Sequence, residues 1–324
     1  MAEFSAGDAY IDQIQSNVLI AYRNPLYIAS QIFPMTPVNL LSGILPQMPQ
    51  SQWFRNQAAA RPVSAQSRRG AFTLDNTMQY VCKWASFGVE LPDLVRDNQV
   101  EPYNLDNACT EFATDKIQME QEINFVNTAF TTSVWSADQT GVASAPGANQ
   151  FIHWSNYGSS NPLTDLATFN DLIEGRVGRE GNKLVLGKQV WTQLKWHPDI
   201  VDTIKYTQRA QMTPELLAAL LEIETVLIGR GIYTTTPEGT AEASVVYSRI
   251  WGKHALLVYT PPAPRILEVS AGYTVGWQRR VSPLGYLKRM RDDEKEVDIF
   301  EANAFYTHKV TSARAGQFMA TAVA

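Results

Sequence analysis

The residue types that most often do chemistry in proteins are few and scattered in this chain. Its four histidines, at positions 153, 197, 254 and 308, lie at least 44 residues apart (197 − 153). A zinc site usually draws two ligands from one short stretch, such as two histidines a helical turn apart. No such pair exists, and no cysteine neighbours a histidine. We therefore expect structural or solvated histidines, and the sequence predicts no metal site.

The segment 181–189 is the nearest approach to a phosphate-binding loop. A P-loop has four residues between its two glycines and a Ser or Thr after the lysine. Here five residues separate Gly181 from Gly187, and Gln189 follows the lysine. The intervening Leu184-Val-Leu186 is typical of a buried strand, which cannot wrap around a phosphate. The segment is interpreted as structural, and no cofactor-binding residues are assigned.

Nucleophilic and acid–base motifs give no catalytic assignment. The chain lacks the Gly-x-Ser-x-Gly sequence of a nucleophile elbow. The carboxylates of Asp292-Asp-Glu294 could imitate an acid–base pair. Because Arg291 and Lys295 flank them, a mixed-charge hairpin turn explains the cluster better. We therefore predict no catalytic residues and a protein that is not an enzyme.

Charge is divided unevenly along the first half of the chain. The stretch from Gln13 to Leu74 contains no Asp or Glu and five arginines, a net charge of +5. The stretch from Asp75 to Asp138 contains eleven acidic and three basic residues, a net charge of −8 (3 − 11). Opposite fields on two segments guide and register association. The partition predicts that the basic front section of one copy lies on the acidic section of a neighbour.

Bulk composition is that of an ordinary globular protein. The chain has 324 residues, of which 45% are hydrophobic and 18% charged, with a net charge of −5. These values disfavour a disordered chain and a dedicated nucleic-acid binder. No apolar run approaches the roughly 20 residues that span a bilayer, so no membrane association is expected. Cys82 and Cys109 are expected to be buried free thiols, which fits a reducing cytosol.

The front of the chain is predicted to be extended. Residues 1–48 form an arm with one short amphipathic helix at 10–22, and the apolar segment 31–38 needs a partner surface. Residues 49–91 form a long hairpin, whose return strand alternates from Phe72 to Trp84. An isolated two-stranded ribbon is marginal in water, so this hairpin also needs something to lie on.

The remaining chain is predicted to contain a long helix and an α/β module. Residues 92–161 include a helix from about 105 to 130, with an apolar stripe that consists of Leu105, Cys109, Phe112, Met119, Ile123, Val126 and Phe130. Residues 162–272 alternate helices with short strands. Residues 273–324 return to β-structure, with a long strand at 297–310.

This order of elements resembles the Hong Kong 97-type fold of the major capsid proteins of tailed bacteriophages. The segments 194–207, 220–231 and 250–259 are similar to stretches that recur in the axial domain of that family. The resemblance implies an α+β fold in which residues 1–48 are the N-terminal arm and 49–91 the E-loop. Residues 92–161 would be the peripheral domain with the spine helix, 162–272 the axial domain, and 273–324 C-terminal strands returning to the peripheral domain.

The resemblance also implies a function and partners. The chain would self-assemble, as hexamers and pentamers, into an icosahedral head shell around double-stranded DNA that it contacts nonspecifically. A portal and a separate scaffolding protein are expected. Some members of the family are cross-linked covalently through a lysine of this hairpin. Here the one lysine of the hairpin, Lys83, lies far from the tip, so no such bond is expected. The shell would then be held by non-covalent contacts or by a decoration protein. The protein would be part of the virion and would assemble in the host cytoplasm.

The charge partition and the resemblance together predict the inter-subunit contacts. The candidates are the cationic tip of the hairpin, two aromatic residues on its outgoing limb, and the acidic face of the long helix. These are Arg61, Arg68, Arg69, Trp53, Phe54, Glu111, Asp115, Glu120 and Glu122. A contact of the arginines with nucleic acid is the weaker alternative, because no aromatic residues are interleaved with them.

Two other functions stay open at this point. An encapsulin-type nanocompartment would use the same fold to enclose cargo enzymes instead of a genome. An α/β enzyme with a small-molecule site in 162–272 is less favoured, because no cluster of titratable residues supports it.

Overall fold

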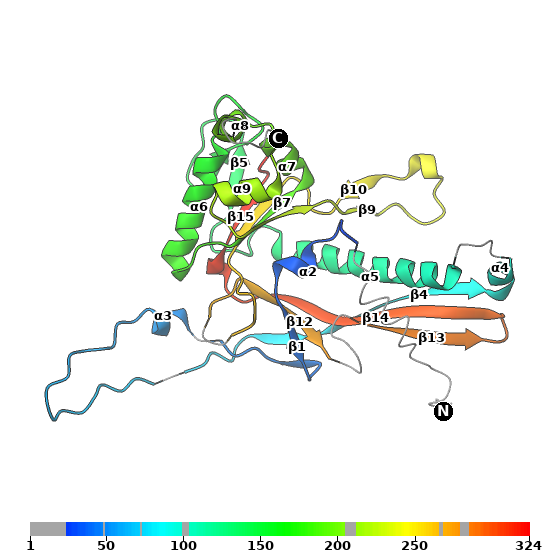
Figure 1. Cartoon of the computed structure of the whole chain (residues 1–324), viewed down its shortest axis with the longest axis horizontal. Helices are drawn as coiled ribbons and strands as arrows, with labels where there is room; N and C mark the ends of the chain where they lie inside the picture. The colour runs from blue at the N-terminus through cyan, green and yellow to red at the C-terminus, as the bar shows by residue number, and fades with distance from the viewer. Residues whose placement is uncertain are drawn as a thin grey trace.

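The computed structural model describes residues 24–47, 49–71, 73–98, 104–204, 212–265, 268–278 and 285–324. The predicted helix at 10–22 and Phe72 lie outside these residues. Figure 1 shows two packed modules, an α/β module above and an elongated sheet with one long helix below. A long loop leaves the lower module on one side. None of the described helices is both long and apolar enough to cross a membrane.

The lower module is built around the strand β14 (Val297–Val310). β14 pairs along one edge with β4 (Lys83–Pro92). Along its other edge it pairs with β13 (Tyr286–Asp292) and β12 (Gly272–Trp277), and β1 (Met35–Val38) continues that side in parallel to β12. The long strand therefore holds together segments from the front, middle and end of the chain.

The helix α5 (Leu105–Ala129) covers this sheet and confirms the predicted long helix. Its N-cap is Asn104, whose side chain accepts a hydrogen bond from the backbone N–H of Asn107. The predicted stripe is only part of the buried surface. Ala113, Ile117 and Phe125 are buried, whereas Phe112 is 50% exposed.

Residues outside the predicted stripe are buried because α5 is covered on two sides. Ala113 and Ile117 face the sheet core with Leu287 and Phe300, while Phe125 faces the junction with the upper module. A single stripe describes a helix with one covered face, and small residues such as Ala113 are inconspicuous in such a pattern.

The upper module contains a six-stranded sheet in the order β6-β5-β15-β11-β7-β8. Its strands are β5 (Gln139–Val142), β6 (Gln150–Ile152), β7 (Lys183–Gly187), β8 (Thr225–Gly229), β11 (Ala255–Val258) and β15 (Gly316–Ala320). The helices α6 (Pro162–Val177), α7 (Lys188–Leu194), α8 (Pro198–Ile204) and α9 (Pro214–Leu220) belong to the same module.

Three strands of this sheet lie outside the predicted axial segment 162–272. β5 and β6 come from the segment assigned to the peripheral domain, and β15 comes from the C-terminal segment predicted to return there. β15 lies between β5 and β11 and is buried throughout. The chain crosses back to the upper module through the 3₁₀ turn Ala313–Ala315. Local periodicity does not show which distant strands pair. The predicted segment 162–272 therefore leaves out three strands of this sheet.

The described end of the arm packs against its own chain. Ile28, Ile32 and Phe33 are buried in the core between the modules, near the short helix α2 (Ala29–Ile32). The apolar segment 31–38 therefore finds its partner surface within the subunit. The expectation that it needs a neighbour is not met by this part of the arm.

The predicted hairpin is regular only at its base. β2 (Ser42–Ile44) pairs with β3 (Gln79–Val81), and an isolated bridge joins Gln47 to Asp75. The return limb has strands at 79–81 and 83–92 only, instead of one strand from 72 to 84. Residues 55–71 have no helix or strand, which fits a ribbon without a sheet beneath it.

Candidate inter-subunit surface

The loop formed by residues 55–71, here called the arginine loop, carries four exposed arginines and no acidic residue. Within the described residues, Arg61, Arg68 and Arg69 make no ion pair; the Nε of Arg61 donates a hydrogen bond to the carbonyl of Ala65. Val63 at the tip is 98% exposed. The loop is thus a cationic projection (Figure 1), and Arg61, Arg68 and Arg69 have no acidic partner among the residues that the structure describes.

The base of the arginine loop is anchored to the upper module. The short helix α3 (Gln50–Trp53) places the side chain of Gln50 against the backbone carbonyl of Arg176, which accepts its hydrogen bond. The ring of Phe54 lies over Gly178, where a Cβ atom would come within 3.0 Å of it. Trp53 and Phe54 nevertheless remain 51% and 55% exposed. Both predicted contact residues are therefore exposed to a neighbour, while Gln50 and Phe54 hold the base of the loop against the upper module.

The predicted acidic face of α5 does not act as one surface. Glu111 and Glu120 are exposed. Asp115 is half-buried and accepts a 2.7 Å hydrogen bond from the Nδ2 of Asn24, with the Tyr27 hydroxyl at 3.5 Å. Asp115 thus holds the arm of its own subunit. Glu111 and Glu120 remain exposed, and Glu120 accepts a 2.8 Å hydrogen bond from the Nδ2 of Asn124 on the same helix.

Glu122 cannot be an inter-subunit contact, because it is fully buried. Its carboxylate accepts hydrogen bonds from the backbone N–H groups of Ile28 at 3.1 Å and Ala29 at 2.8 Å, and from the indole Nε1 of Trp251 at 2.6 Å. Burial raises the pKa of Glu122, while these three donors act in the opposite direction. Glu122 therefore ties the arm, the long helix and the upper module together.

A sequence signal for this role exists but is weak. Glu122 precedes Phe125 by three residues and Ala129 by seven, the spacing of one helix face. Phe125 and Ala129 are both buried. Glu122 was predicted to be exposed because it lies off the apolar stripe that runs from Leu105 to Phe130.

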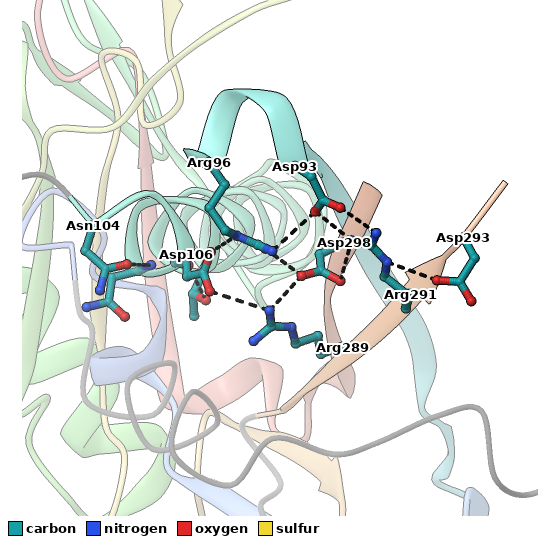
Figure 2. A network of polar contacts seen from close by, with 10 residues as sticks. Asp93, Arg96, Asn104, Asp106, Arg289, Arg291, Asp293 and Asp298 are labelled. Atoms are coloured by element: carbon teal, nitrogen blue, oxygen red, sulfur yellow. Dashed lines mark hydrogen bonds and ion pairs between the residues drawn. The ribbon is translucent and has the colours of Figure 1, made fainter. Parts of the chain in front are cut away.

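A second polar network, missed by the sequence analysis, lies at the far end of α5 (Figure 2). Its centre is Asp298 on β14, whose side chain is 8% exposed. Ion pairs join Asp298 to Arg96 at 2.6 Å and to Arg289 at 2.7 Å. Arg96 also pairs with Asp106 at 3.0 Å. The network connects α4 (Asp93–Asp97), the start of α5, and the strands β13 and β14.

The charges of the network stabilise one another. Burial opposes the charge on Asp298, but the hydrogen bonds from Arg289 and Arg96 outweigh it and hold its pKa below the ordinary value. Arg291 hydrogen-bonds Asp93, which lowers the pKa of that carboxyl. The predicted mixed-charge turn at 292–295 borders this network, since Arg291 also pairs with Asp293 at 3.1 Å.

One arrangement in the upper module has the composition of a catalytic triad. Ser160 Oγ lies 3.0 Å from His197 Nε2, and Asp199 Oδ2 lies 3.7 Å from His197 Nδ1. However, the backbone N–H of Asp199 donates to Nδ1, so the ring proton is on Nε2 and points at Ser160. The Ser160 hydroxyl donates to the Asn156 carbonyl at 2.7 Å. His197 therefore donates to the serine and does not act as its base.

Metal chemistry has no support in the part of the chain that the structure describes. Among those residues, no three His, Cys, Asp or Glu side chains are grouped as a metal ion requires. The prominent features are instead an exposed cationic loop and buried polar contacts that stiffen the body behind it.

Comparisons with known proteins agree with a structural role. No protein-family model matches the chain. The chain is 25% identical over 251 residues to the major capsid protein of Burkholderia phage BcepMu, covering 78% of this chain and 76% of that protein. It is 25% identical over 285 residues to the major capsid protein of Pseudomonas phage JBD67, covering 84% of each.

Solved structures share the fold over nearly the whole length. A phage-related protein from Bordetella bronchiseptica RB50 superposes with a TM-score of 0.74 at 21% identity, covering 97% of this chain and 98% of that chain. A subunit of the mature capsid of bacteriophage PhiM1 gives a TM-score of 0.52 at 10% identity, covering 98% and 91%. These likenesses confirm the predicted α+β fold of the Hong Kong 97 type.

Proposed function

We propose that this chain, a relative of phage major capsid proteins with the Hong Kong 97-type fold, is the major structural subunit of a tailed-phage head shell. The observation that carries this proposal is the similarity to two major capsid proteins, which extends over at least three quarters of each sequence. The protein is accordingly part of the capsid of a virion.

The surface of the subunit supports association with further copies. The arginine loop projects from the body, and its charges find no partner within the described residues. Extended elements of this kind, when they lie on a neighbour, convert weak pair contacts into a cooperative lattice. We place hexamers and pentamers of this chain in the shell.

Further partners follow from the same proposal. A portal and a scaffolding protein would assist assembly, a decoration protein would reinforce the shell, and packaged double-stranded DNA would be contacted nonspecifically. The net charge of −5 supports only weak contact with DNA, because tight binding needs many cationic side chains on the phosphates. Assembly would take place in the host cytoplasm.

Electron microscopy of the purified protein, expressed alone and with its scaffolding protein, tests the proposal. Closed shells are expected, and a monodisperse small oligomer under both conditions would contradict it. The nanocompartment alternative is less supported, because the curated relatives are phage capsid proteins. Particles from infected cells that contained cargo enzymes and no genome would favour it. The relatives are structural proteins, which also leaves the enzyme alternative without support.

A further inference from the structure

The subunit has a second projection besides the arginine loop. The strands β9 (Ile232–Thr234) and β10 (Tyr247–Arg249) pair only over three residues, and a long connection joins them. Residues 232–249, here called the acidic ribbon, extend from the upper module on the side opposite to the arginine loop (Figure 1). A two-stranded ribbon that projects into solvent is marginal without further support.

The acidic ribbon is nevertheless locally ordered. The hydroxyl of Thr234 donates to the carbonyl of Val246 at 2.9 Å, and the backbone N–H of Val246 donates to the hydroxyl of Thr236 at 3.1 Å. The Tyr247 hydroxyl donates to the carboxylate of Glu242 at 2.7 Å. At the base, Tyr233 packs against the core between the modules. The base of the ribbon is thus held by packing and its tip by hydrogen bonds.

The tip of the ribbon is complementary to the arginine loop in charge. The ribbon has three charged residues: Glu238 and Glu242 lie in the connection at its tip, and Arg249 lies at its base, at the end of β10. The arginine loop carries four arginines and no acid. On α5, by contrast, Lys116 lies between the exposed Glu111 and Glu120, which weakens the negative field of the helix. The ribbon tip is therefore the more uniform anionic target.

Exposed apolar side chains accompany the charges on both projections. Ile232, Val246 and Tyr247 are exposed on the ribbon, and Trp53, Phe54 and Val63 are exposed on or beside the loop. An apolar centre with a charged rim is the usual anatomy of a protein interface. Because the two projections leave opposite sides of one subunit, their contact would be head-to-tail, and such contacts close into rings when the rotation permits.

We propose that the acidic ribbon of one copy binds the arginine loop of the next copy around a ring, with Glu238 and Glu242 facing Arg61, Arg68 and Arg69. This inference rests on the proposed shell function and names one of its contacts. It replaces the long helix by the ribbon as the main acidic partner of the loop.

Charge reversal with rescue tests the contact. The ribbon variant is Glu238→Lys with Glu242→Lys, and the loop variant is Arg61→Glu with Arg68→Glu and Arg69→Glu. Each alone is expected to lower the yield of closed particles by about tenfold, since several weak ion pairs repeat at every contact. The combined variant is expected to recover most of that yield. All three should keep the circular dichroism spectrum of the wild type, because the changed side chains are exposed.

A matched control separates the contact from net charge. Glu174→Lys with Glu180→Lys changes the net charge by the same amount at exposed positions of the upper module and should assemble normally with the wild-type loop. If the combined variant assembles no better than the worse parent, or the ribbon variant assembles like the wild type, the contact does not exist. Wild-type shells would still form in that case, so the proposed function would stand. Failure of the wild type to form shells would refute the function itself.

Zero-length cross-linking identifies the partner directly. In shells of the variant Arg68→Lys, a carbodiimide can join the new amine to a carboxylate within contact distance. Mass spectrometry should find it joined to Glu238 or Glu242. Cross-links to Glu111 or Glu120 of α5, or to neither pair, would overturn the assignment.

Discussion

The indole Nε1 of Trp251 donates a 2.6 Å hydrogen bond to the carboxylate of Glu122, across 129 positions of the sequence. The same carboxylate accepts two backbone N–H groups from the arm. A fully buried acid with three donors is a joint between three segments of the subunit, and its removal leaves those donors without a partner.

Replacing Glu122 by Ala should destabilise the subunit by about 3 kcal/mol or more, because each unsatisfied buried donor costs about 1–3 kcal/mol. Glu122→Gln keeps an acceptor and should cost less. Urea unfolding of the unassembled subunit measures both. The control Glu120→Ala changes an exposed acid on the same helix and should have an effect within about 0.5 kcal/mol. Equal stabilities of E122A and E120A would show that the three hydrogen bonds contribute little.

The network at Asp298 predicts a second large effect. Asp298→Asn removes the charge that faces Arg96 and Arg289 in a mostly buried setting, and should cost about 3 kcal/mol. The pKa of Asp298 is lowered in the folded state, so its contribution is present above the unfolded pKa of about 4 and is lost as the pH falls further. Stability measured between pH 7 and pH 3 should show this loss in the wild type and not in D298N. Asp293→Asn, at a side chain that is 91% exposed, is the control and should behave like the wild type.

His308 predicts a pH dependence in a different window. Burial lowers its pKa to about 4 from 6.5, and the Phe125 ring lies 5.4 Å away. The unfolded chain therefore binds a proton between these values that the folded subunit does not, and stability falls as the pH drops from about 6.5 to 4. The loss can reach roughly 3 kcal/mol, at about 1.4 kcal/mol for each pH unit. Thermal unfolding of His308→Gln should show a shallower decline over this range. An unchanged slope would assign those protons to other groups.

Gly178 predicts how firmly the arginine loop is anchored. Its φ of 70° is left-handed, and an added Cβ would press on the ring of Phe54. Gly178→Ala should cost about 1 kcal/mol in backbone strain alone and should loosen the base of the loop. Limited trypsin digestion should then cut faster at the loop arginines. Gly175→Ala, three residues earlier on the same helix with open space at its Cβ, should keep the wild-type cleavage rate and add about 0.5–1 kcal/mol of helix stability.

Several parts of this fold were predictable because they rest on local physics. The long helix follows from its cap at Asn104 and its periodicity, and the strand at 297–310 follows from its length and composition. The exposed arginines of the loop follow from composition. The inter-subunit contacts were predicted from the distribution of charge along the sequence, and they remain a prediction.

Other parts depend on distant neighbours and were not predictable. Glu122 is buried only because Trp251 and the arm arrive from elsewhere in the chain, and Asp298 gains its arginines from two separate elements, α4 and β13. The position of β15 between β5 and β11 likewise depends on contacts between segments that are distant in the sequence. The return limb of the hairpin alternates in sequence, but Trp84 there is 61% exposed while Tyr80 is buried. Alternation identifies two faces and does not say which stretch finds a partner strand.

The geometry of β14 has a mechanical consequence. Its rungs to β4 run in unbroken register from Val297 opposite Pro92 to Tyr306 opposite Lys83, along the long direction of the lower module. A tensile force along that direction would load all these rungs together in shear. Unzipping would require them to break one after another, which needs far less force. A subunit held in this way resists extension along its length better than it resists peeling of β4 from one end.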